Sequence, residues 1–260
     1  MADKRITHRL RGGLDMLEEI RTAGKDRILH DAQVARSVTP EWFEHGFWHQ
    51  RQQWTAVAGG RGAGGRIGEG GQWFLRHYLR GGRAALFSRD RYLFLGTRRV
   101  RSFAEFRLLA GMHEAGLPVP RPIAAHFRRR GGTYSANLIT EWIEGARPLA
   151  GALREGNDAR EIMGRVGVAA ARFHSAGICH ADLNANNILI DPDGGVWLVD
   201  FDRAQRRSPG SWPNARLQRL KRSLEKLGLY DQRAFQALRE RHDRTLAGDD
   251  GETPSPPGLR

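Results

Sequence analysis

The chain has 260 residues, and its 42 lysines and arginines exceed its 29 aspartates and glutamates, for a formal net charge of +13. A single cysteine, Cys179, excludes a scaffold held by intramolecular disulfides. No apolar run approaches the roughly 20 residues that span a bilayer, and the first residues lack the apolar core of a signal peptide. We therefore expect a globular cytoplasmic protein whose basic surface meets an anionic partner, which is nucleic acid, nucleotide phosphate or a membrane surface.

The first part of the chain is predicted to form short strands separated by glycine breaks. Residues 1–25 are polar and weakly patterned, which indicates a loose extension. Strands are expected at 54–58 and 73–79, on either side of the glycine-rich run 59–65. This arrangement predicts a small sheet with a glycine flap.

A helix is expected next, starting at Ser102. Ser102 and Glu105 form an S-x-x-E start signal ahead of a helical stripe of apolar residues. A further strand is predicted at 135–140, and the segment 141–145 after it is the expected boundary to a more helical second half. Beyond that boundary we expect helices at 158–177, 214–227 and 231–246, and a disordered tail from residue 248.

The clearest local signal is a β-hairpin around the turn 191–195, whose sequence is Asp-Pro-Asp-Gly-Gly. Pairing the two strands about this turn predicts that Asn187, at the start of the first strand, lies opposite Asp200, at the end of the second. Asp182 lies on the loop just before the hairpin. The pattern therefore gathers three oxygen-bearing side chains at one end of a hairpin.

Such a set has the parts of a phosphoryl-transfer site. Oxygen ligands from Asn187 and Asp200 suit Mg²⁺, while Asp182 accepts the proton of an attacking hydroxyl or orients that hydroxyl. Together with His180, these residues resemble the protein-kinase-like superfamily, because they match its catalytic loop H-x-D-L-x-x-x-N and its metal-binding Asp-Phe motif. His180 is expected to hold the loop backbone by a hydrogen bond and not to act as an acid or base.

The glycine run upstream fits the motif G-x-G-x-x-G with Gly60, Gly62 and Gly65. Glycines in such a loop let backbone N–H groups approach the phosphates of a nucleotide. The motif is weak by itself, because arginine- and glycine-rich loops are often linkers. Its position between two expected strands favours ATP binding.

A cation is expected to reach the nucleotide phosphates from the strand at 73–79. Protein kinases use a lysine there, but this strand has none, so Arg76 is the best-placed substitute, ahead of His77. Glu105 is a candidate partner for that cation. The alternative, in which Glu105 only completes a capping box with Ser102, stays open on the sequence alone.

Several segments are similar to the bacterial 3-deoxy-D-manno-octulosonic acid (Kdo) kinase family over about residues 26–230. Arg76, in place of lysine, and Asp202, in place of glycine, both agree with this family. The segments that carry the resemblance are 75–82, 102–108, 116–122, 180–189, 200–203 and 219–227.

The resemblance implies an α+β, bilobal protein-kinase-like fold. A small N-terminal lobe, an antiparallel sheet with one helix, is expected at 26–142, and a larger, mainly helical C-terminal lobe at 143–247. The extension 1–25 and the tail 248–260 lie outside both lobes.

The resemblance also implies ATP- and Mg²⁺-dependent phosphorylation of the Kdo sugar of a lipid A precursor, at its 4-OH, in lipopolysaccharide core biosynthesis. The expected location is the cytoplasmic face of the bacterial inner membrane, as a peripheral protein without an obligate protein partner. The basic clusters at 98–101, 128–130 and 214–227 would then meet an anionic glycolipid and membrane. The leucines of 214–227 either form an apolar face at that membrane or pack inside the lobe.

Two alternative functions are compatible with the same site residues. One is another small-molecule phosphotransferase, of the aminoglycoside or choline type, whose cationic acceptors call for an acidic pocket and fit a charge of +13 poorly. The other is a basic, nucleic-acid-associated protein with a kinase-like fold. That alternative leaves the complete set of Asp182, Asn187 and Asp200 unexplained, so nucleic acid is not the expected partner.

Overall fold

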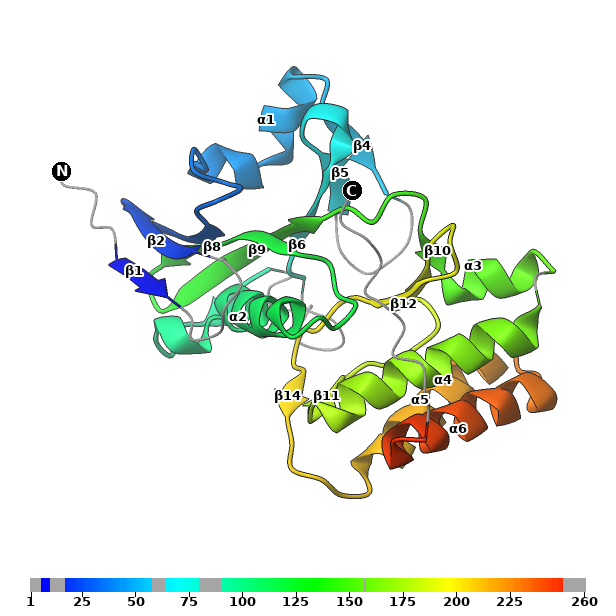
Figure 1. Ribbon diagram of the computed structural model, residues 1–260. Coiled ribbons are helices and arrows are strands. Elements are labelled where there is room, and N and C mark those ends of the chain that lie inside the picture. Colours follow the sequence, from blue (N-terminus) through cyan, green and yellow to red (C-terminus); the bar gives the residue numbers. More distant parts are fainter. Residues whose placement is uncertain (1–5, 10–16, 58–63, 80–89, 157, 250–260) are drawn as a thin grey trace. The chain divides into compact units, whose positions relative to one another are not determined.

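The computed structural model describes most of the chain (Figure 1). The described residues are 6–9, 17–57, 64–79, 90–156 and 158–249. They divide into two compact units, and we call Met1–Glu114 with Pro120–Trp142 the N-terminal unit and Ala115–Val119 with Ile143–Arg260 the C-terminal unit. Among the described helices, none combines the length and apolar character needed to cross a membrane. The predicted α+β class is confirmed.

The N-terminal unit is built on a nine-stranded antiparallel sheet in the order β1-β2-β3-β8-β9-β6-β5-β4, with β7 paired to β9. Its strands are β1 Ile6–Arg9, β2 Leu17–Ala23, β3 Asp26–Asp31, β4 Trp54–Ala56, β5 Gly64–Ile67, β6 Trp73–His77, β7 Tyr92–Leu93, β8 Pro122–Arg130 and β9 Thr133–Glu141. The strands expected at 54–58, 73–79 and 135–140 are therefore present as β4, β6 and β9.

This sheet is larger than expected, because residues 6–9 and 17–23 form β1 and β2 where a loose extension was predicted. β2 pairs with β3 from Glu18 to Ala23, and the last four residues of β3 are buried. The guanidinium of Arg21 also donates to the Val38 carbonyl oxygen at 2.7 Å. Pairing with a buried neighbour thus organises a segment whose own pattern gives a weak strand signal.

Helical segments cover both faces of this sheet, where a single helix was expected. They are η1 Pro40–Phe43, α1 His45–Gln50, η2 Glu69–Gly71, η4 Thr97–Arg99 and α2 Arg101–Glu114. The Phe43 ring stacks on His126 of β8 at 4.7 Å between centroids, and Phe103 of α2 meets the adjacent Phe127 at 5.2 Å. Because successive side chains of a strand point to opposite faces, η1 and α2 pack on opposite sides of the sheet.

The C-terminal unit is mainly helical and carries two small antiparallel sheets, β10-β12-β13 and β11-β14. Its helices are α3 Leu149–Arg154, α4 Ala159–Ser175, α5 Trp212–Lys226 and α6 Gln232–Ala247. Its strands are β10 Arg147–Pro148, β11 Ile178–Cys179, β12 Ile188–Ile190, β13 Val196–Leu198 and β14 Gln205–Arg206. The expected helices at 158–177, 214–227 and 231–246 are confirmed. Most of the predicted tail lies outside the described residues.

Helices α4 and α6 pack closely enough to require a glycine. A Cβ atom at Gly167 would lie 2.2 Å from the Leu238 carbonyl oxygen, so no larger residue fits there without a shift of the backbone. In the same interface Nδ1 of His174 lies 2.8 Å from Nε2 of His242, and Nδ1 of His242 lies 2.8 Å from the Asp243 carboxylate. Burial lowers the pKa of His174 to about 3, with His242 acting in the same direction.

The leucines of α5 belong to the interior of the C-terminal unit. Leu217, Leu220 and Leu224 are at most 1% exposed. Of the two interpretations of this apolar stripe, burial supports packing within the unit and leaves these side chains no membrane-facing role.

Candidate active site

His180 organises the loop between β11 and β12. Its Nδ1 accepts a hydrogen bond from the Asp182 backbone N–H at 3.1 Å, so its Nε2 carries the proton and donates to the Val199 carbonyl oxygen at 3.0 Å. Burial lowers the pKa of His180, against smaller opposing contributions from the Val199 hydrogen bond and nearby carboxylates. The imidazole is therefore neutral, and the predicted structural role of His180 is confirmed.

Asp182 projects from this loop with a half-exposed carboxylate. Arg219 of α5 donates to Oδ1 of Asp182 from Nε at 2.8 Å, and Asn184 donates to the same oxygen from Nδ2 at 3.0 Å. Partial burial raises the pKa of Asp182, but the hydrogen bonds from Asn184 and Arg219 outweigh this, and the net shift is downward. Asp182 is thus a carboxylate with one oxygen held in place.

Two asparagine side chains hold this loop by hydrogen bonds to its backbone. Oδ1 of Asn184 accepts from the N–H groups of Asn186 and Asn187 at 2.9 and 3.2 Å. Nδ2 of Asn187 donates to the Asp182 carbonyl oxygen at 3.0 Å, which leaves the Asn187 Oδ1 atom to act as a ligand. Asn184 has no predicted role, although Asn side chains commonly accept a hydrogen bond from the backbone two residues on and so form a turn of this kind.

The hairpin is present, but its register differs from the prediction by one residue. β12 pairs with β13 through Ile188 with Leu198, and the Val199 N–H donates to the Asn187 carbonyl oxygen at 3.0 Å. Asn187 therefore lies opposite Val199, and the prediction that it lies directly opposite Asp200 is wrong. The turn sets this register. Oδ1 of Asp191 accepts a hydrogen bond from the Gly195 N–H, and the first pair of strand residues beyond the turn is Ile190 with Val196.

Asp200 nevertheless comes directly after the residue that pairs with Asn187. Its backbone adopts φ +63°, a left-handed conformation that Asp tolerates better than most residues and that turns the chain sharply at the end of the second strand. The next residue, Phe201, is 1% exposed and packs on Phe173 and His180. Burial of the Phe201 ring therefore anchors the backbone that carries Asp200.

The donor set at this hairpin end fits a hard divalent cation. Asn187 and Asp200 offer neutral and anionic oxygen, the ligand type that Mg²⁺ takes together with water and substrate phosphates. In the described part of the chain, no three His, Cys, Asp or Glu side chains cluster closely enough to hold a metal ion by themselves. A cation held by Asn187 and Asp200 would thus need further oxygen ligands.

Of the predicted glycine motif, Gly65 is described, whereas Gly60 and Gly62 lie outside the described residues. Gly65 is buried inside β5, and a Cβ atom there would lie 2.5 Å from the indole ring of Trp54. Packing of a tryptophan over the strand therefore accounts for this glycine without a nucleotide. A role of Gly65 in ATP binding stays a prediction.

Arg76 and Glu105 form the ion pair for which the sequence made Glu105 a candidate. Nη2 of Arg76 lies 2.6 Å from Oε2 of Glu105, and the Tyr78 hydroxyl donates to the same oxygen at 2.5 Å. Ser102 instead donates through Oγ to the His126 carbonyl oxygen at 3.0 Å, so it does not cap α2. For Glu105 these contacts favour the ion pair over the capping box, and Tyr78 is a second partner that the sequence did not reveal.

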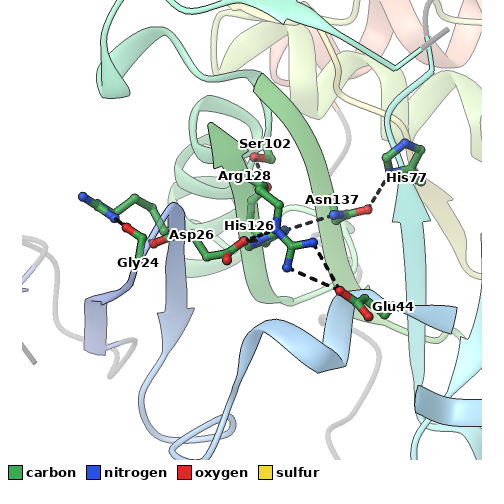
Figure 2. A network of polar contacts seen from close by, with 9 residues as sticks. Gly24, Asp26, Glu44, His77, Ser102, His126, Arg128 and Asn137 are labelled. Atoms are coloured by element: carbon green, nitrogen blue, oxygen red, sulfur yellow. Dashed lines mark hydrogen bonds and ion pairs between the residues drawn. The ribbon is translucent and has the colours of Figure 1, made fainter. Parts of the chain in front are cut away.

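His77, the second candidate cation, belongs to a different network, which Figure 2 shows running across the sheet. Nδ1 of His77 lies 2.7 Å from Oδ1 of Asn137, Nδ2 of Asn137 lies 3.0 Å from Nδ1 of His126, and Nε2 of His126 lies 2.6 Å from the Asp26 carboxylate. The amide of Asn137 fixes the donors in this series of hydrogen bonds: His77 donates to the amide oxygen, and His126 accepts from the amide nitrogen.

This network separates the two candidates in space. Adjacent residues of a strand point to opposite faces, so His77 lies on the face of the Asn137 network and Arg76 on the face of α2. Arg128 adds a further donor to Asp26 at 2.7 Å and reaches Glu44 at 3.3 Å (Figure 2). Arg76 therefore shares a face with Glu105 of α2 whereas His77 does not, and contact of Arg76 with phosphates stays a prediction.

A sequence profile described as "Lipopolysaccharide kinase (Kdo/WaaP) family" matches residues 45–240. The chain is 51% identical over 188 residues to a protein of Stenotrophomonas maltophilia (strain K279a) named 3-deoxy-D-manno-octulosonic acid kinase, covering 68% of this chain and 73% of that protein.

Proteins with the same name in two other bacteria are similar over longer stretches. The protein of Xylella fastidiosa (strain M12) is 41% identical over 225 residues, which cover 83% of this chain and 89% of that protein. The protein of Vibrio vulnificus (strain CMCP6) is 37% identical over 212 residues, or 78% and 86% of the two chains.

Proposed function

The chain belongs to the lipopolysaccharide kinase (Kdo/WaaP) family, and on that premise we propose that it transfers the γ-phosphoryl group of ATP to the 4-OH of the Kdo sugar on a lipid A precursor. The proposal is supported by relatives named 3-deoxy-D-manno-octulosonic acid kinase. The observation that carries it is the carboxylate of Asp182, held on a braced loop beside a hairpin end with Asn187 and Asp200.

In this proposal Asp182 receives the acceptor hydroxyl. A half-exposed carboxylate with one oxygen already held can accept a hydrogen bond from a sugar O–H, orient its oxygen toward the γ-phosphorus and take up the proton as transfer proceeds. His180 takes no part in the proton transfer, because both of its ring nitrogens are engaged by the backbone. Its contribution is to fix the position of the loop.

Asn187 and Asp200 would hold Mg²⁺. When bound, the ion neutralises charge on the phosphates and aligns them for in-line transfer. The Asn187 amide suits this task because its nitrogen is tied to the Asp182 backbone, so that its oxygen is presented as a ligand.

Arg76 would contact the nucleotide phosphates, with Gly60, Gly62 and Gly65 as candidate backbone donors. The Arg76 side chain is 20% exposed, and Glu105 and Tyr78 hold one of its nitrogens. Arginine carries five donors in a planar fork, a geometry that suits phosphate oxygens as well as a carboxylate. An arginine in this position favours a fixed, forked contact over the point charge of a lysine.

We further propose that the protein works as a peripheral protein at the cytoplasmic face of the inner membrane. Leu93 and Leu95 are 68% and 65% exposed, and the exposed Arg98 and Arg99 follow them closely in the chain. Apolar side chains beside basic ones suit the headgroup region of an anionic bilayer.

The test of the proposed reaction is transfer of label from radioactive ATP to a purified Kdo-lipid A precursor, with aminoglycosides and RNA as competing acceptors. We expect label on the glycolipid, dependent on added Mg²⁺ and located at the 4-OH by NMR of the product. Label on an aminoglycoside but not on the glycolipid would reject the Kdo assignment, and label at another sugar hydroxyl would reject only the regiochemistry.

A further inference from the structure

One face of α5 is fastened to the loop that precedes the hairpin. Nη1 of Arg216 donates to the Ala181 carbonyl oxygen at 3.2 Å, and the Ala185 N–H donates to Oγ of Ser223 at 3.2 Å. Arg219 lies between these two helix positions and donates to the carboxylate of the same loop. Since residues three and four apart share a helix face, the three α5 side chains act on the loop from one side.

The contact from Arg219 falls on a single oxygen of Asp182. Nε and Nη2 of Arg219 lie 2.8 and 2.5 Å from Oδ1, and Nδ2 of Asn184 lies 3.0 Å from the same atom. Within the described part of the chain, no hydrogen bond reaches Oδ2 of Asp182. The carboxylate is thus held through one oxygen and presents the other.

We propose that Arg219 is a positioning residue that holds Oδ1 of Asp182 so that Oδ2 faces the acceptor hydroxyl. This inference rests on the proposed function. In the step it serves, the hydroxyl oxygen bonds to the γ-phosphorus, the bond from that phosphorus to the bridging oxygen breaks, ADP leaves with the bridging electrons, and the hydroxyl proton passes to Oδ2. Arg219 itself exchanges no proton.

Geometry makes positioning a better account of Arg219 than stability. The side chains of Arg219 and Asp182 are 44% and 45% exposed. Half-exposed ion pairs contribute little to the free energy of folding, because water and salt screen them. A two-pronged contact from a planar guanidinium still restricts rotation of the carboxylate, and small losses of alignment reduce the rate of transfer strongly.

The test compares Arg219→Ala and Arg219→Lys with Arg233→Ala, which removes an exposed arginine of α6. We expect Arg219→Ala to lower kcat about 100-fold, with KM for ATP and for the glycolipid within about two-fold and an unchanged melting temperature. Arg219→Lys retains part of the activity, and Arg233→Ala behaves as wild type. Millimolar guanidinium should restore part of the activity of Arg219→Ala but not that of Asp182→Ala.

A double-mutant comparison completes the test. In the Asp182→Asn background, Arg219→Ala should have almost no further effect on kcat, because the group it positions has already changed. An equal loss in both backgrounds would overturn the proposal. So would a rise in KM for the glycolipid at constant kcat, because Arg219 would then bind the acceptor itself.

The same assays separate this inference from the proposed function. Wild-type protein that fails to phosphorylate the glycolipid would reject the function. Wild-type protein that phosphorylates it, with Arg219→Ala equally active, would reject only the positioning role.

Discussion

Arg76–Glu105 in the N-terminal unit and Arg219–Asp182 in the C-terminal unit are both arginine–carboxylate pairs, and they differ in burial. Glu105 of the N-terminal unit is 3% exposed on its side chain and shares one oxygen between Arg76 and Tyr78. Asp182 of the C-terminal unit is 45% exposed and paired with an exposed Arg219. The same two chemical groups therefore serve different ends: the buried pair is tied to the packing of α2 on the sheet, whereas the exposed pair sets the direction of a carboxylate.

The largest expected effect comes from removing the exposed carboxylate. Asp182→Ala should reduce phosphoryl transfer by about 10²–10⁴-fold, the usual contribution of a group that accepts a proton in the transition state. ATP binding should persist, because the proposed nucleotide contacts lie on other residues. Steady-state kinetics and equilibrium binding of a fluorescent ATP analogue measure the two quantities. Robust turnover by this variant would contradict the role of Asp182.

Asp200→Ala should also impair the site in the C-terminal unit, because it removes a proposed Mg²⁺ ligand. Loss of the anionic ligand at the hairpin end is expected to weaken Mg²⁺-dependent nucleotide binding by about ten-fold or more, in the range seen when metal-site groups are changed. Calorimetric titration with ATP, with and without Mg²⁺, measures this. Asp193→Ala, on the exposed turn of the same hairpin, is the matched control and should bind as wild type.

Glu105→Gln tests the buried pair and should act on stability. Removing one charge of a buried pair leaves the other poorly compensated, and we expect a loss of about 3 kcal/mol in the free energy of unfolding. Asp182→Asn, the matching change in the exposed pair, should cost about 1 kcal/mol at most. Urea denaturation of both variants measures the difference. Equal losses would show that burial is not what separates the two pairs.

Acid should destabilise the C-terminal unit through His174, the buried histidine of α4. His174 has an ordinary pKa of 6.5 when unfolded and a pKa of about 3 when folded, because burial and the neighbouring His242 and Arg216 disfavour its charge. The unfolded chain therefore binds a proton first, and stability falls as the pH drops from 6.5 toward 3, by about 1.4 kcal/mol per unit. Urea midpoints between pH 7 and pH 4 should show a smaller slope for His174→Gln.

The smallest expected effect comes from substituting an arginine that has no carboxylate partner. Within the described residues, Arg98 and Arg99 are exposed and form no ion pair. If they meet an anionic bilayer, Arg98→Ala should weaken sedimentation with anionic vesicles about five-fold, since a basic residue near such a surface contributes about 1 kcal/mol. Arg98→Lys keeps the charge and should bind as wild type. Protein that stays in the supernatant at low salt would remove the membrane proposal.

The parts of the structure that were predicted correctly are those whose conformation is decided by residues close together in the sequence. The Asp158 cap, which accepts from the N–H groups of Arg160 and Glu161, marked the start of α4 correctly. The Asp-Pro-Asp-Gly-Gly turn identified the hairpin, and His180 fitted a structural role. In each case the residues that decide the conformation lie within a few positions of one another.

The features that were missed depend on residues far apart in the chain. Arg219 and Asp182 are separated by 37 positions, and an amphipathic helix pattern does not say which of its arginines reaches another element. β2 forms because β3 offers a buried partner strand, which its own polar sequence does not reveal. The one-residue error in the position of Asn187 arose because turn composition predicts a hairpin but not which residues close it.

Helix α5 also ties the loop to its own rotation. Arg216, Arg219 and Ser223 lie on one face of a helix whose leucines are locked in the interior, so all three contacts move as one body. Inserting a single residue between Leu220 and Ser223 would turn the two halves of α5 by about 100° relative to each other, so the buried leucines and the loop contacts could not all be kept, whereas an alanine substitution breaks one contact. The orientation of the Asp182 carboxylate therefore depends on the rotation of α5 about its own axis, which the buried Leu217, Leu220 and Leu224 fix.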